Sequence, residues 1–140
     1  MSDFEAVKAW HEAMGLPSDE AQFEDEEFKQ RRARYLAEEF AETMSALGFH
    51  VSVSFSLQTY GSATSLWKLP KPSKEEFADG ICDSVWVNWG SLVELGWNGD
   101  GAFSEVVRSN WTKLGAPRDA AGKLMKGPHF IAPDLSKYVK

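Results

Sequence analysis

Apolar residues recur every three or four positions near the start of the chain, which is the spacing of an amphipathic helix. The stripe consists of Phe4, Val7, Trp10 or His11, and Met14. Ser2 with Glu5 three residues later fits a capping box, and Gly15 ends the pattern. We therefore expect a short helix over about residues 2–15, with Trp10 packed in the core.

A longer helix is expected over residues 23–47, which contain no Gly or Pro and are rich in Ala, Glu, Arg and Leu. Its apolar stripe includes Phe28, Leu36, Phe40, Met44 and Leu47. At about 100° per residue, Glu38 and Glu42 fall on the side away from this stripe, and Glu39 falls on its flank. The three carboxylates therefore share one face of the helix.

The period then changes to two, which is the side-chain alternation of a strand. Residues 49–57 alternate apolar and polar side chains, with the apolar side made of Phe49, Val51, Val53, Phe55 and Leu57. Residues 58–62 contain a glycine suited to a turn, and residues 63–69 fit the returning strand. We expect a half-buried β-hairpin over about residues 49–69.

Two further helices are predicted beyond the Pro-containing break that begins at Pro70. The first covers about residues 74–95, capped by Ser73 with Glu76, and its stripe is Phe77, Ile81, Val85, Trp89, and Leu92 or Val93. Its Asp79 and Asp83 are four residues apart, so both lie on one face. A shorter helix is expected over residues 101–115, followed by a tail that is punctuated by Pro and Gly.

The composition indicates one soluble domain over residues 1–140. That length is typical of one domain, and the 43% of hydrophobic residues are enough for one core. The net charge of −6 argues against a nucleic-acid clamp, because phosphate backbones demand a basic surface. The single cysteine, Cys82, favours a reducing cytoplasm, and neither a signal peptide nor a membrane span is expected.

Two of the predicted helices carry clustered carboxylates, namely Glu38, Glu39 and Glu42 on one and Asp79 and Asp83 on the other. If these helices pack side by side, the acids converge and repel one another unless cations neutralise them. Hard oxygen ligands of this kind suit Mg²⁺, with Mn²⁺ as a substitute. The plain alternative is a solvated helix face, and the spacing alone favours that alternative.

Cationic and amide side chains gather late in this acidic chain. They are Arg108, Asn110, Lys113, Lys123 and Lys126. Beside a metal-bound polyphosphate they would complete its charge balance. Each lysine taken alone is better explained by a basic tail that pairs with the acidic residues 24–27.

Five segments occur together in one order: AWHEAMGLP, LAEEFAET, ADGICDSVWVNWG, EVVRSNWTKLG and GKLMKGPHFIAPDL. Their order and spacing resemble those of MazG-like proteins in the all-α nucleoside triphosphate pyrophosphohydrolase superfamily, above all members common in phages. The resemblance covers nearly the whole chain except residues 49–69, which look like an insertion. It implies an all-α, MazG-like helical bundle assembled as a homodimer or homotetramer, in the host cytoplasm if a phage encodes it.

The resemblance also implies Mg²⁺-dependent hydrolysis of a nucleoside triphosphate to the monophosphate and pyrophosphate. The residues that match the metal motifs of the family are Glu38, Glu39, Glu42 and Asp83. The family's Glu–x–x–Asp motif is altered here, because the position three before Asp83 is Gly80, and Asp79 is the expected replacement ligand. Glu38 or Glu39 would orient or deprotonate the attacking water.

The substrate-binding residues that the resemblance implies are His11, Trp86, Arg108, Asn110, Lys113, Lys123 and Lys126. His11 would line the nucleoside pocket, although a structural role on its helix stays open, and Trp86 would contact the sugar. We expect a purine deoxynucleotide, dGTP before others, with dCTP or dUTP as the alternative. Two interpretations of other classes also stay open: a helical interaction protein that lost catalysis through Gly80, and an acidic bundle without a ligand.

Overall fold

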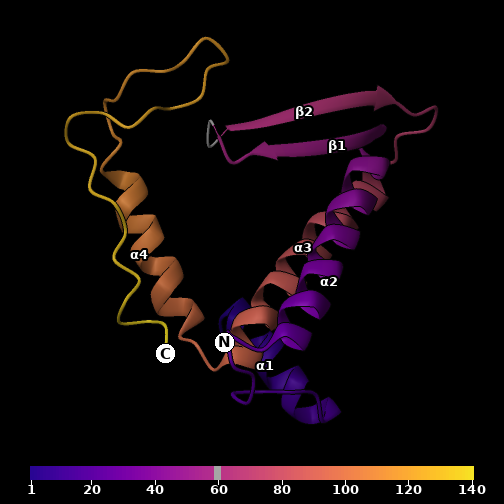
Figure 1. Ribbon diagram of the computed structural model, residues 1–140, viewed down its shortest axis with the longest axis vertical. Coiled ribbons are helices and arrows are strands. Elements are labelled where there is room, and N and C mark those ends of the chain that lie inside the picture. The colour runs from indigo at the N-terminus through magenta and orange to yellow at the C-terminus, as the bar shows by residue number, and fades with distance from the viewer. Residues whose placement is uncertain (59–60) are drawn as a thin grey trace. The chain divides into compact units, whose positions relative to one another are not determined.

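The computed structural model describes residues 1–58 and 61–140 of the chain (Figure 1). The described residues contain four helices and one two-stranded sheet. They group into two units, of which one combines Met1–Ala21 with Leu92–Lys140 and the other is Gln22–Ser91. Each unit has its own packing, and no described helix meets the length and hydrophobicity that a membrane crossing requires.

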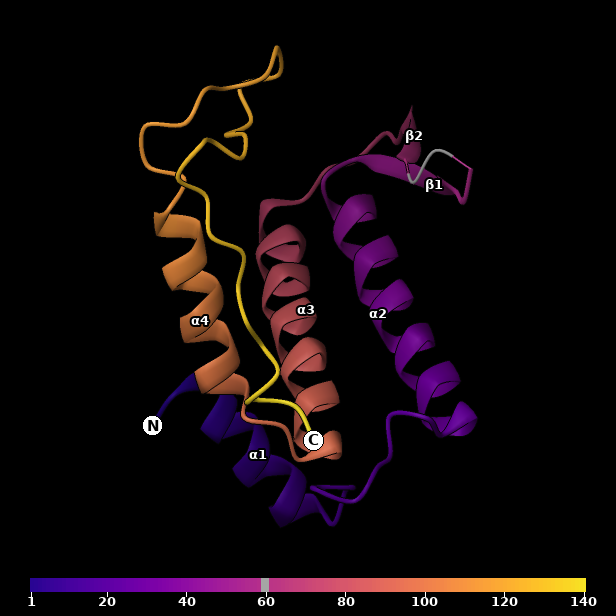
Figure 2. The same ribbon diagram turned by 60° about the vertical axis from the view of Figure 1, so that its left-hand side comes forward.

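The unit of residues 22–91 is built on α2 (Glu26–Ala46) and most of α3 (Lys74–Leu95), which lie side by side in both ribbon views (Figures 1 and 2). Asp25 caps α2 by accepting a hydrogen bond from the Glu27 backbone N–H at 3.0 Å. The buried Arg32 of α2 donates to the Val87 carbonyl at 2.7 Å and to the Ser91 hydroxyl at 3.0 Å. These two bonds tie the first half of α2 to α3.

A hairpin connects the two helices, as the change of period predicts. Strand β1 (Phe49–Ser56) pairs antiparallel with β2 (Gly61–Lys68), in a register that runs from Phe49 opposite Lys68 to Ser56 opposite Gly61. Two residues of the predicted turn, Thr59 and Tyr60, lie outside the described residues.

The prediction that the hairpin is half buried holds only at the start of β1, where Phe49 and Val51 are half buried. It is wrong for the rest of the apolar side, since Val53 is 54% exposed and Phe55 59% exposed, and every residue of β2 is exposed. Strict alternation places apolar side chains on one face of a sheet, but it does not supply an element to cover that face.

The other unit contains α1 (Asp3–Met14), α4 (Gly99–Trp111) and the C-terminal segment. The capping box of α1 is confirmed, since Ser2 Oγ accepts from the Glu5 N–H at 3.1 Å and Glu5 Oε2 accepts from the Ser2 N–H at 2.7 Å. The segment after α4 turns back and runs along that helix (Figure 1). Its Tyr138 carbonyl accepts from the Asn98 N–H at 3.0 Å, and its Ile131 carbonyl accepts from the Ser109 hydroxyl at 2.8 Å.

Close backbone approaches hold this unit together where α4 begins. A Cβ atom on Gly99 would lie 2.5 Å from the Phe4 ring, and one on Gly101 would lie 2.5 Å from the Tyr138 ring. Glycine at these two positions therefore lets α1 and the C-terminal segment pack against the first turn of α4. Val93, at the end of α3, is fully buried in the same unit.

The predicted apolar stripes are only partly buried. Phe4, Val7 and Phe28 are buried, whereas the exposed stripe residues are Met14, Leu36, Phe40, Leu47, Ile81 and Val85. The expected core position of Trp10 is wrong: its side chain is 38% exposed, while His11 is 4% exposed. His11, four residues after Val7, therefore lies on the buried side of α1, whereas Trp10, three residues after Val7, does not.

Candidate active site

The three glutamates of the α2 motif sit in different environments. Glu38 and Glu42 are exposed, while Glu39 is half buried. The Oε2 atom of Glu39 is shielded from solvent and has no hydrogen-bond partner among the described residues. A buried carboxylate oxygen without a donor is costly, so Glu39 is the member of this group that most needs a cation.

A pocket of about 270 Å³ lies between α2 and α3, and most of the residues that line it are carboxylates. Its lining residues are Glu42, Ser45, Ala46, Glu76, Asp79, Gly80 and Asp83. The structure thus brings together the predicted Glu42, Asp79 and Asp83 from the two helices.

Glu76 is a pocket residue that the sequence interpretation missed. The sequence assigned Glu76 only to the cap of α3. Its backbone N–H does donate a hydrogen bond to Ser73 Oγ at 3.2 Å, so that assignment is also correct. The signal that would have found it is its spacing, three residues before Asp79 and therefore on the same face of the helix.

The charges of this group act on Glu39. Burial raises the pKa of Glu39 above its ordinary value, and the increase is enlarged by the negative charges of Asp83, Glu42, Glu38 and Asp79. All four of these are predicted metal-site residues, and two of them lie on the other helix. Carboxylates of both helices therefore lie close enough to Glu39 to raise its pKa, as the predicted convergence requires.

The donor set fits Mg²⁺ in an open form. In residues 1–58 and 61–140, no group of three or more His, Cys, Asp or Glu side chains is already arranged around one metal position. Mg²⁺ usually keeps several waters and is held by one or two carboxylates together with substrate phosphates, rather than by a complete protein cage. The unpartnered Glu39 oxygen and the carboxylate pocket meet that requirement.

In the other unit, two of the predicted phosphate-binding lysines gather around one ring. The ammonium groups of Lys113 and Lys126 lie 5.6 Å and 5.1 Å from the centre of the Phe130 ring. Lys113 also donates to Asn110 Oδ1 at 2.7 Å. Asn110, Lys113 and Lys126 therefore form one cationic group, which we call the lysine cluster.

Arg108 and Lys123 have other contacts. Arg108 donates two hydrogen bonds to the Glu105 carboxylate, at 2.8 Å and 2.7 Å, and one to the Ala132 carbonyl at 3.3 Å. The bonds from Arg108, followed by one from the Asp134 N–H, lower the pKa of Glu105 to about 2. Lys123 is exposed, and its backbone N–H donates to Asp119 Oδ1 at 2.8 Å.

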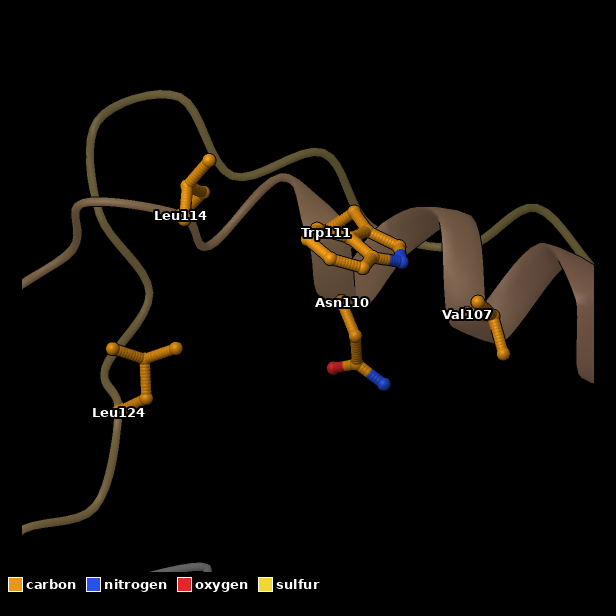
Figure 3. Close-up of a pocket in the computed structure, with 5 residues that line it drawn as sticks. All are labelled: Val107, Asn110, Trp111, Leu114 and Leu124. Carbon is orange, nitrogen blue, oxygen red and sulfur yellow. The ribbon is translucent and has the colours of Figure 1, made fainter.

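A mostly apolar pocket of about 320 Å³ is formed by α4 and the segment that follows it (Figure 3). Its lining residues are Val107, Asn110, Trp111, Leu114 and Leu124. The indole of Trp111 is 70% exposed, and the Asn110 amide extends into the open space between Val107 and Leu124 (Figure 3). The sequence interpretation missed this pocket, although Val107, Trp111 and Leu114 have helical spacing.

The two remaining predicted substrate residues lie in different units. His11 is buried in the N-terminal helix, and its Nδ1 atom is 2.9 Å from the Pro17 carbonyl oxygen. Trp86 is on α3 and is 39% exposed. The first of these positions is compatible with the structural role that was left open for His11.

A comparison with protein families identifies the class of this enzyme. The chain matches the phosphoribosyl-ATP pyrophosphohydrolase family over residues 7–110, which is more than half of its length. The chain belongs to this family. The family is part of the MazG-like all-α superfamily, so the resemblance and the all-α fold with a small hairpin are both confirmed. This pyrophosphohydrolase is thus an enzyme that acts on phosphoric anhydride bonds in nucleotides. No curated protein matches the chain significantly.

Proposed function

We propose that this pyrophosphohydrolase is Mg²⁺-dependent and cleaves a nucleoside triphosphate to the monophosphate and pyrophosphate. The proposed metal residues are Glu38, Glu39, Glu42, Asp79 and Asp83. The observation that carries the proposal is the buried, unpartnered Oε2 atom of Glu39, whose pKa is raised in part by the other four carboxylates. A divalent cation would remove that repulsion and give the oxygen its missing partner.

The reaction adds the elements of water across the anhydride bond between the α- and β-phosphates. When bound, Mg²⁺ supplies positive charge to the phosphate oxygens and polarises phosphorus toward attack. Glu38 or Glu39 accepts a hydrogen bond from the attacking water and takes its proton as the new P–O bond forms. The bond to the bridging oxygen breaks, and that oxygen leaves with the pyrophosphate.

The lysine cluster is proposed to bind the phosphates. The ammonium groups of Lys113 and Lys126 both lie close to the Phe130 ring, and clustered cations stabilise charge that develops on a departing pyrophosphate. Arg108 and Lys123 are assigned the same task. Arg108 would bind phosphate either while it stays bonded to Glu105 or by exchanging those bonds for bonds to the phosphate. His11 and Trp86 are proposed to contact the nucleoside.

The proposed base is a purine, with dGTP before other deoxynucleotides. Asn110, whose Oδ1 accepts from Lys113, also carries an amide NH₂ group that can donate to a ligand in the α4 pocket. Guanine presents two acceptors, O6 and N7, on one edge, whereas adenine pairs an acceptor with a donor there. The exposed Trp111 indole supplies a stacking surface. The alternative is a pyrimidine triphosphate, dCTP or dUTP.

The enzyme is proposed to work as a homodimer or homotetramer in the cytoplasm, phage-encoded and without a nucleic-acid partner. Exposed apolar residues on both long helices support an assembly, and they include Leu36 and Phe40 on α2 and Ile81 and Val85 on α3. The net charge of −6 supports the absence of a nucleic-acid partner.

The test is release of pyrophosphate from a panel of deoxynucleoside triphosphates, ribonucleoside triphosphates and phosphoribosyl-ATP, with Mg²⁺ and with EDTA. We expect pyrophosphate release with Mg²⁺, fastest for dGTP, and none with EDTA. We also expect Glu39→Ala to lose turnover. Glu27→Ala, an exposed glutamate in the first turn of α2, is the matched control and should keep full activity. No release from any nucleotide would contradict the proposal, and unchanged turnover in Glu39→Ala would contradict the metal assignment.

A further inference from the structure

Gly80 of α3 lies directly against Thr43 of α2. A Cβ atom on Gly80 would lie 2.6 Å from Thr43 Oγ1 and 3.1 Å from Thr43 Cα. Both residues are buried, and the Thr43 hydroxyl is also 3.4 Å from that of Ser84. Carbon and oxygen atoms that are not bonded do not approach so closely, so any side chain at position 80 would push the helices apart or displace Thr43.

This contact falls inside both carboxylate motifs. Thr43 directly follows Glu42 and lies one turn after Glu39, while Gly80 directly follows Asp79 and lies three residues before Asp83. One turn of helix rises about 5.4 Å, so each of these carboxylates stands within a turn of the point where the helices touch. The separation of the helices at Gly80 therefore sets how closely the two sets of carboxylates approach.

We infer that Gly80 is a positioning residue, whose missing side chain lets α2 and α3 meet at Thr43 and so brings their carboxylates to one metal. This inference rests on the proposed metal-dependent function. It gives position 80 a purpose other than a lost ligand, because a glutamate there would collide with Thr43. The pocket carboxylates that precede Gly80, Glu76 and Asp79, and the one that follows it, Asp83, supply the oxygen ligands instead.

The experiment is a titration of the full chain with Mn²⁺, followed by water proton relaxation, beside the Mg²⁺ dependence of pyrophosphate release. Substitutions that disturb the support of metal ligands typically weaken metal affinity about 10–100-fold. We expect Gly80→Ala to weaken Mn²⁺ binding by this factor and to raise the Mg²⁺ concentration needed for half-maximal release.

Two double variants identify the contact as the cause. Thr43→Ala removes the Oγ1 atom that lies 2.6 Å from the added Cβ, so Gly80→Ala with Thr43→Ala should recover part of the lost affinity. Thr43→Val keeps two branches at Cβ, so Gly80→Ala with Thr43→Val should not recover it. If the single Gly80→Ala variant fails to fold, the double variant with Thr43→Ala should fold and bind Mn²⁺, whereas the one with Thr43→Val should not.

Gly101→Ala is the control for a clash that does not concern the metal. Its Cβ would lie 2.5 Å from the Tyr138 ring in the other unit, so it should lower the melting temperature and leave the Mn²⁺ affinity unchanged. Wild-type affinity in Gly80→Ala, or equal affinities in the two double variants, would overturn the inference while leaving the proposed function intact. Absence of Mn²⁺ binding by the unsubstituted chain would overturn both.

Discussion

At the scale of a single residue, Glu39 is the central residue of the proposed site. Its neighbours Glu38 and Glu42 reach solvent, whereas its own Oε2 atom is buried, unpartnered and surrounded by like charges. A group held this way is unfavourable for the free protein and favourable for a protein that binds a cation. If Mg²⁺ binds as proposed, this oxygen would link the stability of the fold to the metal.

We predict that Glu39→Gln raises the melting temperature in EDTA near neutral pH. The pKa of Glu39 is raised in the folded protein, so its ionisation opposes folding, and stability falls as the pH rises through that pKa. The neutral amide removes this penalty and also the response to metal, which for Mg²⁺ at 100 times its dissociation constant is about 2.7 kcal/mol in the wild type. Thermal unfolding with and without Mg²⁺ measures both effects.

Glu38→Gln is the matched control for that measurement, since it removes an exposed carboxylate at the adjacent position. It should change the melting temperature in EDTA less than Glu39→Gln does. A lower melting temperature for Glu39→Gln in EDTA would show that its carboxylate is satisfied without a cation.

A second residue-scale prediction concerns acid. The pKa of Glu105 is lowered to about 2, chiefly by the hydrogen bonds from Arg108. A lowered carboxyl pKa contributes stability that is complete above the ordinary value of 4.5 and is lost as the pH falls toward 2. Glu105→Gln should therefore lose stability at pH 6 and show a flatter decline between pH 4.5 and 2, measured by thermal unfolding at a series of pH values. Equal slopes for the two proteins in that range would contradict the assignment.

At the scale of elements, burial separates segments that look alike in sequence. Phe28 of α2 and Phe55 of β1 both occupy apolar positions of a regular pattern, but Phe28 is buried and Phe55 is exposed. Helix α2 has α3 beside it, while in the described part of the hairpin only the start of β1 is half buried and the rest of the apolar face is exposed. A pattern marks which side chains share a face; a neighbouring element decides whether that face leaves water.

We predict that Phe28→Ala destabilises the protein by about 3–5 kcal/mol, the usual effect of truncating a buried Phe. Phe55→Ser should change stability by no more than about 0.5 kcal/mol, as is usual for surface substitutions. Urea denaturation of both variants, at one protein concentration, provides the measurement. A loss for Phe55→Ser as large as that for Phe28→Ala would mean that another surface covers the hairpin in solution.

At the scale of the whole molecule, the family match over residues 7–110 runs through parts of both units, so the segments that make the enzyme are distributed along most of the chain. The prediction of one domain over residues 1–140 stays a prediction, as does the homo-oligomer. The exposed apolar residues of α2 and α3 are the physical argument for an assembly, because large apolar patches on a soluble protein mark interaction surfaces.

We therefore predict that Phe40→Glu lowers the molar mass measured by light scattering from that of a dimer or tetramer toward that of one 15.6 kDa chain. Phe40 is 45% exposed on α2, so a charge there has access to water in a single chain but would be desolvated between subunits. Lys29→Glu, an exposed position near the start of the same helix, is the control and should leave the mass unchanged. A monomeric wild type would contradict the prediction directly.

The sequence by itself determined the local structure and the class of the enzyme. Helix α3 runs over residues 74–95 as expected, α1 begins at its predicted capping box, and the hairpin follows the change to a period of two. These features depend on residues within a few positions of one another. The carboxylates on each helix could be named for the same reason.

Only the tertiary structure decided which of these residues meet. It added Glu76 to the carboxylate pocket, placed Gly80 against Thr43, left most of the hairpin face exposed, and joined Lys113 to Asn110 and Lys126 around Phe130. Such contacts join residues that are distant along the chain or belong to irregular segments, and no local period encodes the distance between two helix axes. The distance between α2 and α3 is what gives Gly80 its proposed positioning role.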